Sequence, residues 1–193
     1  MRKTKKDLKP LRITCTSSNC ASNLHCFKKA KKMAEEDYGK CRSCGIELVD
    51  WHRVHKRDVK DSSFVFVALK TELIRHHFWH KAIDIRAINH ARRKGLIKLE
   101  QATKKRLEKY IAPLNNAFDG RQTPQEGNII FYAQHALACC CRTCLEYWHG
   151  IPKNAEMTSE DIDYFTSLIL MYVKERLPDL SLDGEKIPNL LKV

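Results

Sequence analysis

Residues 134–149 hold four cysteines and two histidines in one short run, and this density constrains the chain more than any other feature. No glycine or proline interrupts the run, so it predicts one helix, or a helix with one irregular turn, within residues 129–149. On a helix, residues three or four apart share a face, as Cys140 and Cys144 would. Sulfur and imidazole ligands at that spacing can reach one metal ion. The candidate ligands of this site are Cys140, Cys141, Cys144, His135 and His149.

Two alternatives to a metal site remain open for this run. Free cysteines are small apolar residues, so the thiols can be unligated parts of the core. A reactive thiolate is the second alternative, with Cys140 as nucleophile and His135 as base.

A second group of cysteines lies near the N-terminus. Cys41-Arg42-Ser43-Cys44-Gly45 has the form of a zinc knuckle, in which a tight turn lets both thiolates face one ion. A thioredoxin-like redox pair is the alternative, but no βαβ pattern surrounds it. We expect a closed, structural four-ligand site. Its ligands are Cys15, Cys20, Cys41 and Cys44, with Cys26 or His25 as a possible substitute for one upstream ligand.

The number of cysteines and the hydropathy bear on where such sites can form. No apolar run approaches the roughly 20 residues of a membrane span, and no apolar segment follows the basic N-terminus as in a secretory signal. We therefore expect a cytoplasmic protein without a membrane interaction. Disulfides are disfavoured in that compartment, and nine cysteines cannot all pair within one chain.

The net charge of +12 gives a field that attracts polyanions. Basic residues are concentrated in residues 1–60 and 86–109, and this uneven distribution favours a binding face for DNA or RNA over a uniformly solvated surface. A basic surface that only maintains solubility is the alternative. The candidate phosphate contacts are Arg92, Arg93, Lys94, Lys98, Lys104 and Lys105.

Hydrophobic periodicity predicts a mainly α fold, α+β overall, with short strands only in the N-terminal part. Asp84 is expected to begin a helix that Gly95 ends, and Thr158 with Asp161 forms a capping-box-like start. Further helices are expected at about 27–37, 62–80, 99–111, 129–149 and 158–177, and strands at 11–14 and 46–51. The domains expected are a basic arm and zinc module at 1–60, a helical domain at 61–178 and a loosely attached tail at 179–193.

Residues from about 97 to 177 resemble a bacterial family described as domain of unknown function 4186. The matching segments are Asp119-Gly120-Arg121-Gln122-Thr123-Pro124, Ala133-Gln134-His135-Ala136, Cys140-Cys141-Arg142, Cys144-Leu145-Glu146 and Trp148-His149-Gly150-Ile151-Pro152. The resemblance implies that Gln134, His135, Cys140, Cys141, Cys144, Trp148 and His149 belong to the family motif. Cys139 stands where a small residue such as Thr is expected. The N-terminal module lies outside the resemblance, which implies a site without naming a reaction.

The function expected first is a zinc-binding, nucleic-acid-associated protein with one zinc ion, or two if the 129–149 helix also binds one. An iron–sulfur group on Cys140, Cys141 and Cys144 is an alternative cofactor. An enzyme is the first alternative function, with an open metal position at that site. Its catalytic candidates are Cys140, His135, Asp119, Arg121 and Gln134. A structural adaptor with a protein partner is the second alternative.

Overall fold

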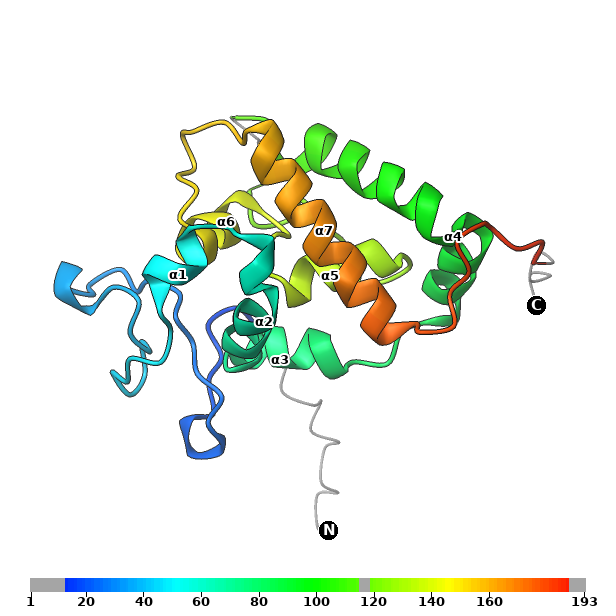
Figure 1. Cartoon of the computed structure of the whole chain (residues 1–193). Helices are drawn as coiled ribbons and strands as arrows, with labels where there is room; N and C mark the ends of the chain where they lie inside the picture. The colour runs from blue at the N-terminus through cyan, green and yellow to red at the C-terminus, as the bar shows by residue number, and fades with distance from the viewer. Residues whose placement is uncertain (1–12, 115–118, 188–193) are drawn as a thin grey trace, which may run out of the picture.

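The computed structural model describes residues 13–114 and 119–187 of the chain. The prediction of a mainly α fold is confirmed, because seven α-helices form the described part (Figure 1). The short strands expected in the N-terminal part are absent from these residues. Only two isolated bridges occur there, Asn19 with Leu24 and His25 with Glu72. Among the described helices, none has both the length and the apolar character needed to cross a membrane.

The segment 13–61 is mostly irregular. It contains the short 3-10 turns Cys20–Ser22, Glu35–Asp37 and Val59–Asp61 and the helix α1, Trp51–His55. The strand expected at 46–51 is wrong, because these residues pair with no strand and lead into α1, where Asp50 accepts a hydrogen bond from Arg53 N at 3.0 Å. Instead of the helix expected at 27–37, only the turn at Glu35–Asp37 forms. Of the strand expected at 11–14, residues 13–14 are irregular and the rest lies outside the described residues.

The helix expected at 62–80 is broken into α2, Ser62–Lys70, and α3, Leu73–His80. The break is at Glu72, which is extended. The break forms because the backbone of His25, from the N-terminal part, hydrogen bonds to a residue on each side of Glu72. His25 N donates to Thr71 O at 2.7 Å, and Leu73 N donates to His25 O at 3.0 Å. A contact distant in sequence therefore outweighs the local helical pattern.

Asp84 begins α4, Ile85–Arg106, as predicted, and its carboxylate accepts from Ala87 N at 2.9 Å. Gly95 interrupts this helix with φ 66°, which an L-residue rarely adopts. A single π turn, Leu107–Ile111, follows α4. The tail runs back to this kink, where Leu96 N donates to Ser181 O at 3.0 Å and Ile97 N donates to Leu182 O at 3.1 Å.

The core surrounds α5, Ile129–Ala136, which packs against α3, α4 and α7. Helix α7, Ser159–Arg176, begins at the predicted capping box of Thr158 and Asp161. Helix α6, Arg142–His149, packs against α1 and so joins the N-terminal part to the helical part. One hydrophobic core contains Phe27 from the N-terminal part together with helix residues. The domain boundary after residue 60 stays a prediction.

Candidate metal centres

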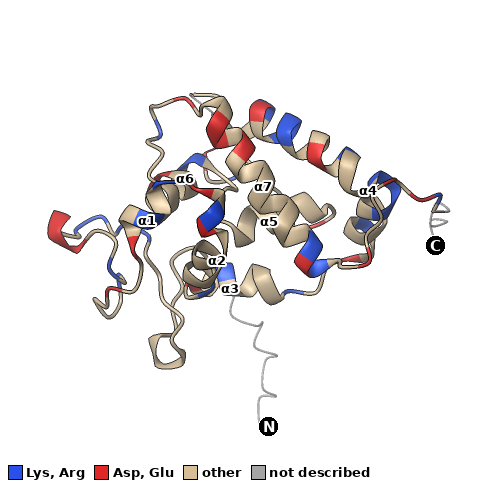
Figure 2. Cartoon of the chain, in the orientation of Figure 1, with Lys and Arg blue, Asp and Glu red and all other residues tan. Residues whose placement is uncertain are grey.

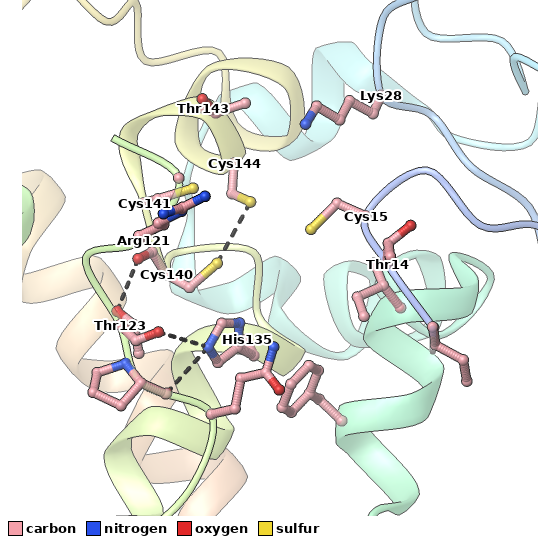
Figure 3. A pocket seen from close by; sticks show the side chains of 16 residues that line it. Thr14, Cys15, Lys28, Arg121, Thr123, His135, Cys140, Cys141, Thr143 and Cys144 are labelled. Carbon is pink, nitrogen blue, oxygen red and sulfur yellow. Dashed lines mark hydrogen bonds between the residues drawn. The ribbon is translucent and has the colours of Figure 1, made fainter. Parts of the chain in front are cut away.

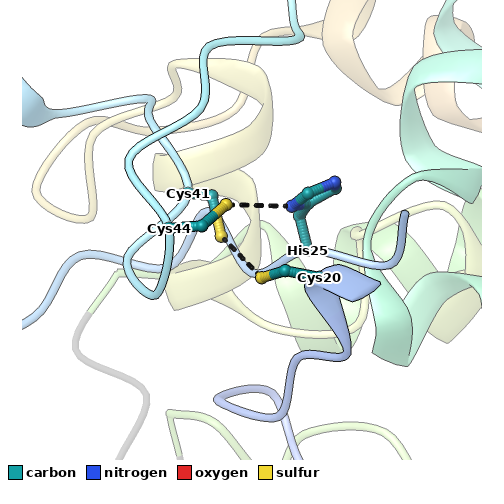
Figure 4. Close-up of side chains that lie close together, drawn as sticks. All are labelled: Cys20, His25, Cys41 and Cys44. Carbon is teal, nitrogen blue, oxygen red and sulfur yellow. Dashed lines mark hydrogen bonds between the residues drawn. The ribbon is translucent and has the colours of Figure 1, made fainter. Parts of the chain in front are cut away.

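The first cluster combines three thiols and one imidazole. Ligand atoms of Cys20, His25, Cys41 and Cys44 all lie within 4.8 Å of one another (Figure 4). Cys20 Sγ is 3.8 Å from Cys41 Sγ, and Cys44 Sγ is 3.5 Å from His25 Nδ1. Around a tetrahedral zinc ion, with Zn–S of about 2.3 Å and Zn–N of about 2.0 Å, such pairs lie about 3.8 Å and 3.5 Å apart. The four side chains are therefore positioned to bind one metal ion.

The backbone fixes these ligands from two directions. Gly45 N donates to Cys41 O at 2.8 Å, and Cys41 N donates to Ile46 O at 2.9 Å, which closes a tight turn around both thiols. Gly45 has φ 75°, as expected for the glycine after this turn. Burial raises the pKa of Cys41, but hydrogen bonds from the backbone of Cys26 and of residues in the turn outweigh it and lower the pKa to about 6.

The fourth position of this cluster differs from the set expected first. His25, named as a substitute ligand, stands there, and Cys15 does not. Cys26 is also outside the cluster, because its Sγ donates to Cys15 O at 3.3 Å. His25 is directed to the site by its backbone hydrogen bonds at the α2–α3 break.

Two forms were open for residues 129–149. The continuous helix is wrong, and the structure is nearer to the form with an irregular turn, because residues 137–141 separate α5 from α6. Ala138 has φ 54°, a conformation uncommon for alanine. The Gln134 side chain stabilises this turn by donating from Nε2 to Cys139 O at 3.2 Å, and Thr123 Oγ1 donates to Cys140 O at 2.8 Å. The helical spacing argument for residues 134–141 therefore does not hold.

Three of the thiols nevertheless converge. Sγ atoms of Cys140, Cys141 and Cys144 lie within 4.8 Å of one another, and all three residues are buried. Cys140 Sγ donates to Cys144 Sγ at 3.5 Å, close to the separation in a tetrahedral thiolate site. A hydrogen bond with Cys141 lowers the pKa of Cys140, but the bond with Cys144 and burial raise it well above the usual value.

A fully buried arginine stands behind this second cluster. Arg75 donates from Nη2 to Cys144 Sγ at 3.2 Å and from Nε to Glu72 Oε2 at 3.0 Å. Glu72 is also fully buried and accepts from Trp148 Nε1 at 2.6 Å and from Phe27 N at 3.2 Å. The sulfur of a metal-bound thiolate is a charged acceptor that suits a guanidinium donor. Sequence reasoning missed Arg75 and Glu72 because nothing in the α3 pattern marks them as buried.

The remaining members of the predicted second site lie outside this group. His149 is buried, donates from Nε2 to Leu137 O at 2.9 Å, and packs against Phe165. Burial lowers its pKa to about 3. Cys139 is fully buried, and burial raises its pKa to about 12. His135 stacks on Phe78 with ring centroids 4.4 Å apart, and its Nε2 lies 3.2 Å from Thr123 O.

Cys15 is in neither group of mutually close ligand atoms, but it lines a cavity beside the second cluster. A cavity of about 450 Å³ is lined by Cys15, His135 and the three clustered cysteines. Figure 3 shows the Cys15 sulfur pointing into the cavity, on the side of the Cys140 and Cys144 sulfurs. A hydrogen bond with Cys144 is the main cause that lowers the pKa of Cys15 to about 6.

The other catalytic candidates have structural partners. Asp119 accepts from Thr143 N at 3.1 Å and pairs with Lys153 at 2.9 Å, so its carboxylate holds the start of α6. Gln134 is fully buried and accepts from Arg106 Nε at 2.7 Å, in addition to its bond at the 137–141 turn. Arg121 lines the cavity beside the thiols (Figure 3).

The basic candidates lie on α4, where Figure 2 shows both signs of charge. Lys104 pairs with Asp163 at 2.7 Å, so part of its charge is compensated. Between Ile85 and Leu99 the helix carries no acidic residue. The basic residues of this stretch are Arg86, Arg92, Arg93, Lys94 and Lys98.

Comparison with known proteins gives a family but no activity. No solved structure matches the chain. The family model described as "Domain of unknown function (DUF4186)" matches residues 63–174, a range that begins earlier than the resemblance seen in the sequence. The match contains Cys140, Cys141, Cys144 and Arg75, whereas the first cluster lies outside it. The chain therefore belongs to the DUF4186 family and carries an additional cysteine-rich N-terminal part.

Proposed function

We propose that the protein binds two zinc ions, one in each cysteine cluster. The observation that carries this proposal is the set of ligand separations, 3.8 Å and 3.5 Å between thiols and 3.5 Å between thiol and imidazole. Thiolate and imidazole ligands in a tetrahedral arrangement are the ligand set of structural zinc sites. A reducing, cytoplasmic environment would keep these thiols available for metal.

Zinc fits the second cluster better than an iron–sulfur group. In a four-iron cluster each thiolate binds a different iron atom, which spreads the sulfurs around a group larger than one ion. The Sγ atoms of Cys140, Cys141 and Cys144 instead converge within 4.8 Å of one another. The short separation of Cys140 and Cys144 suits two ligands of one ion.

Metal content per chain tests this proposal. Untagged protein purified without oxygen is expected to contain two zinc ions, and Cys144→Ala is expected to contain one. Cys139→Ala is the matched control, because Cys139 is buried beside the cluster without belonging to it. One zinc ion in both wild type and Cys144→Ala would restrict zinc to the first cluster, and iron in place of zinc would overturn the choice of metal.

We propose a second role, in which the α4 stretch 85–99 contacts the phosphate backbone of DNA or RNA. Arg92, Arg93 and Lys98 are exposed there, and no acidic residue interrupts the stretch. Contacts of this kind carry little sequence preference, and affinity falls with salt because counterions are released on binding. The two zinc sites would then stabilise the scaffold that presents α4.

Binding measured at several salt concentrations tests the nucleic-acid role. Replacing both Arg93 and Lys98 by Ala is expected to reduce the slope of log affinity against log salt by about 1–2 for duplex DNA. Lys174→Ala, an exposed change on α7, is expected to leave the slope unchanged. Absence of binding to single-stranded and duplex DNA and RNA at low salt would contradict this role.

An enzyme is the alternative function, favoured by the cavity beside the second cluster. Cys140, Cys141 and Cys144 would hold a zinc ion beside the cavity, and the ion would supply activation of water for hydrolysis. Arg121 would contact an anionic substrate there. Hydrolysis of phosphate or carboxylate esters by the zinc-loaded protein, absent in Cys144→Ala, is the expected result for this alternative.

A further inference from the structure

We infer that the Cys15 thiolate is the fourth ligand of the second metal site, together with Cys140, Cys141 and Cys144. The inference rests on the proposed zinc ion at this cluster and specifies its coordination. Structural zinc sites have four protein ligands, and three thiolates leave one position to be filled. The fourth ligand must come from a residue that reaches the same cavity.

Cys139, His149, Cys15 and His135 are the candidates for the fourth ligand. Their positions in the structure decide which of them can reach the metal. Cys139 is fully buried in the hydrophobic core. His149 packs against Phe165 and uses Nε2 at Leu137 O. Neither residue lines the cavity. Cys15 and His135 both do, so the choice lies between these two.

The contacts favour Cys15 over His135. The Cys15 sulfur points into the cavity on the side of the Cys140 and Cys144 sulfurs, as Figure 3 shows. The His135 ring is held by stacking on Phe78, and its Nε2 lies 3.2 Å from both Thr123 O and Pro124 O. Cys15 is held in place because Cys26 Sγ donates to its carbonyl oxygen at 3.3 Å.

Charge supports a site with four thiolates. A zinc ion with four thiolates has a net charge of about −2, which is costly to bury without nearby cations. Arg75 is fully buried against Cys144, and Lys28 lines the same cavity as Cys15 (Figure 3). Outer-shell hydrogen bonds of this kind tune a metal site and orient its ligands.

This coordination joins two parts of the chain. Cys140, Cys141 and Cys144 lie in the range matched by the family model, and Cys15 lies outside it. Cys20, on the same short segment as Cys15, belongs to the first cluster. Metal at the second site therefore fastens the N-terminal segment to the start of α6. A closed four-thiolate site also leaves no position for substrate, in contrast to the enzyme alternative.

The test is X-ray absorption at the zinc edge combined with zinc content, on the full chain loaded with zinc. Wild type is expected to give four sulfurs at one zinc, and three sulfurs and one nitrogen at the other. Cys15→Ser is expected to lose one sulfur and to release its second zinc to a chelator far faster, with affinity lower by more than about 100-fold, since outer-shell changes alone cost about 10–100-fold. Cys15→His is expected to restore retention with nitrogen in place of that sulfur, which separates ligand loss from misfolding.

The possible results separate two claims, that Cys15 is a ligand and that the second cluster binds zinc at all. An unchanged sulfur count in Cys15→Ser, or loss of a nitrogen ligand in His135→Gln, would overturn Cys15 as the ligand while the second zinc stands. A single zinc in wild type, unaffected by Cys144→Ser, would instead overturn the second zinc site itself. Cys139→Ala is expected to match wild type in both measurements.

Discussion

The Arg75 guanidinium donates a hydrogen bond to Cys144 Sγ at 3.2 Å although both residues are buried. The same guanidinium pairs with Glu72 at 3.0 Å, and neither side chain of this pair has solvent exposure. Tyr147 OH lies 2.9 Å from Arg75 Nη2 and 3.1 Å from Glu72 Oε2. The second cluster is therefore supported by a polar network in which each charge has a partner.

Arg75→Met is expected to lower the free energy of unfolding by about 3–5 kcal/mol, because Glu72 would stay buried without its cation. Arg53→Met is the control, since Arg53 pairs with Asp61 at the surface, where solvent screens the pair and its contribution to stability is small. Denaturant unfolding of both variants measures the difference. Adding Glu72→Gln to Arg75→Met is expected to recover part of the loss. Equal effects of the two Arg variants would contradict the buried network.

Gly95→Ala is expected to detach the tail from α4. An alanine there would adopt a strained conformation at φ 66°, which costs about 1–3 kcal/mol, and its Cβ would approach the Asp183 backbone. Gly120→Ala is the control, because Gly120 also has positive φ but open space around it. Limited proteolysis is expected to cleave the tail of Gly95→Ala faster than that of Gly120→Ala. Identical cleavage and stability of the two variants would contradict a fastened tail.

Acid is expected to destabilise the fold through His149. Burial lowers its pKa to about 3 from the usual 6.5. Between these values the unfolded state binds a proton that the folded state does not, so stability falls as pH falls below 6.5, by up to about 1.4 kcal/mol per pH unit. His149→Gln is expected to lack this contribution. The measurement is the free energy of unfolding against pH for wild type and for His149→Gln. Zinc release affects both proteins alike, so the difference between the two curves reports His149 alone. If the free energies of unfolding of the two proteins differ by a constant amount from pH 7.5 to pH 4, the loss of stability in acid does not come from His149.

Alkylation followed by mass spectrometry is expected to rank the cysteines. After chelation of zinc, Cys44 is expected to react early because it is exposed, and Cys139 last because burial keeps it a protonated thiol with pKa about 12. With zinc bound, Cys44 is expected to be protected by coordination. Modification of Cys139 at the rate of Cys44 would show that the 137–141 turn opens in solution.

Elements governed by local signals could be predicted from the sequence. The side chains of Thr158 and Asp161 each accept a hydrogen bond from the other's backbone N–H, within one turn. Asp84 caps α4 because its carboxylate accepts from Ala87 N, three residues later. Gly95 marked its kink because glycine alone tolerates that backbone at little cost. These features depend on neighbours within a few residues, which the sequence displays directly.

The errors arise where distant contacts decide the conformation. Nothing near Ala138 announces positive φ, because the turn is held by the Gln134 side chain and by Thr123 from a separate loop. Closeness in sequence groups Cys15 with Cys20, whereas the chain path places Cys15 at the cavity beside Cys144. The order of cysteines along the chain therefore indicates that clusters able to bind a metal form, without assigning each cysteine to its cluster.

The kink at Gly95 has a consequence for biosynthesis. At this kink the backbone N–H groups of Leu96 and Ile97 donate hydrogen bonds to the carbonyl oxygens of Ser181 and Leu182. Domains fold as they leave the ribosome, beginning at the N-terminus. Helix α4 is therefore made before residues 181–182, and this bend becomes fully hydrogen bonded only after those residues have followed.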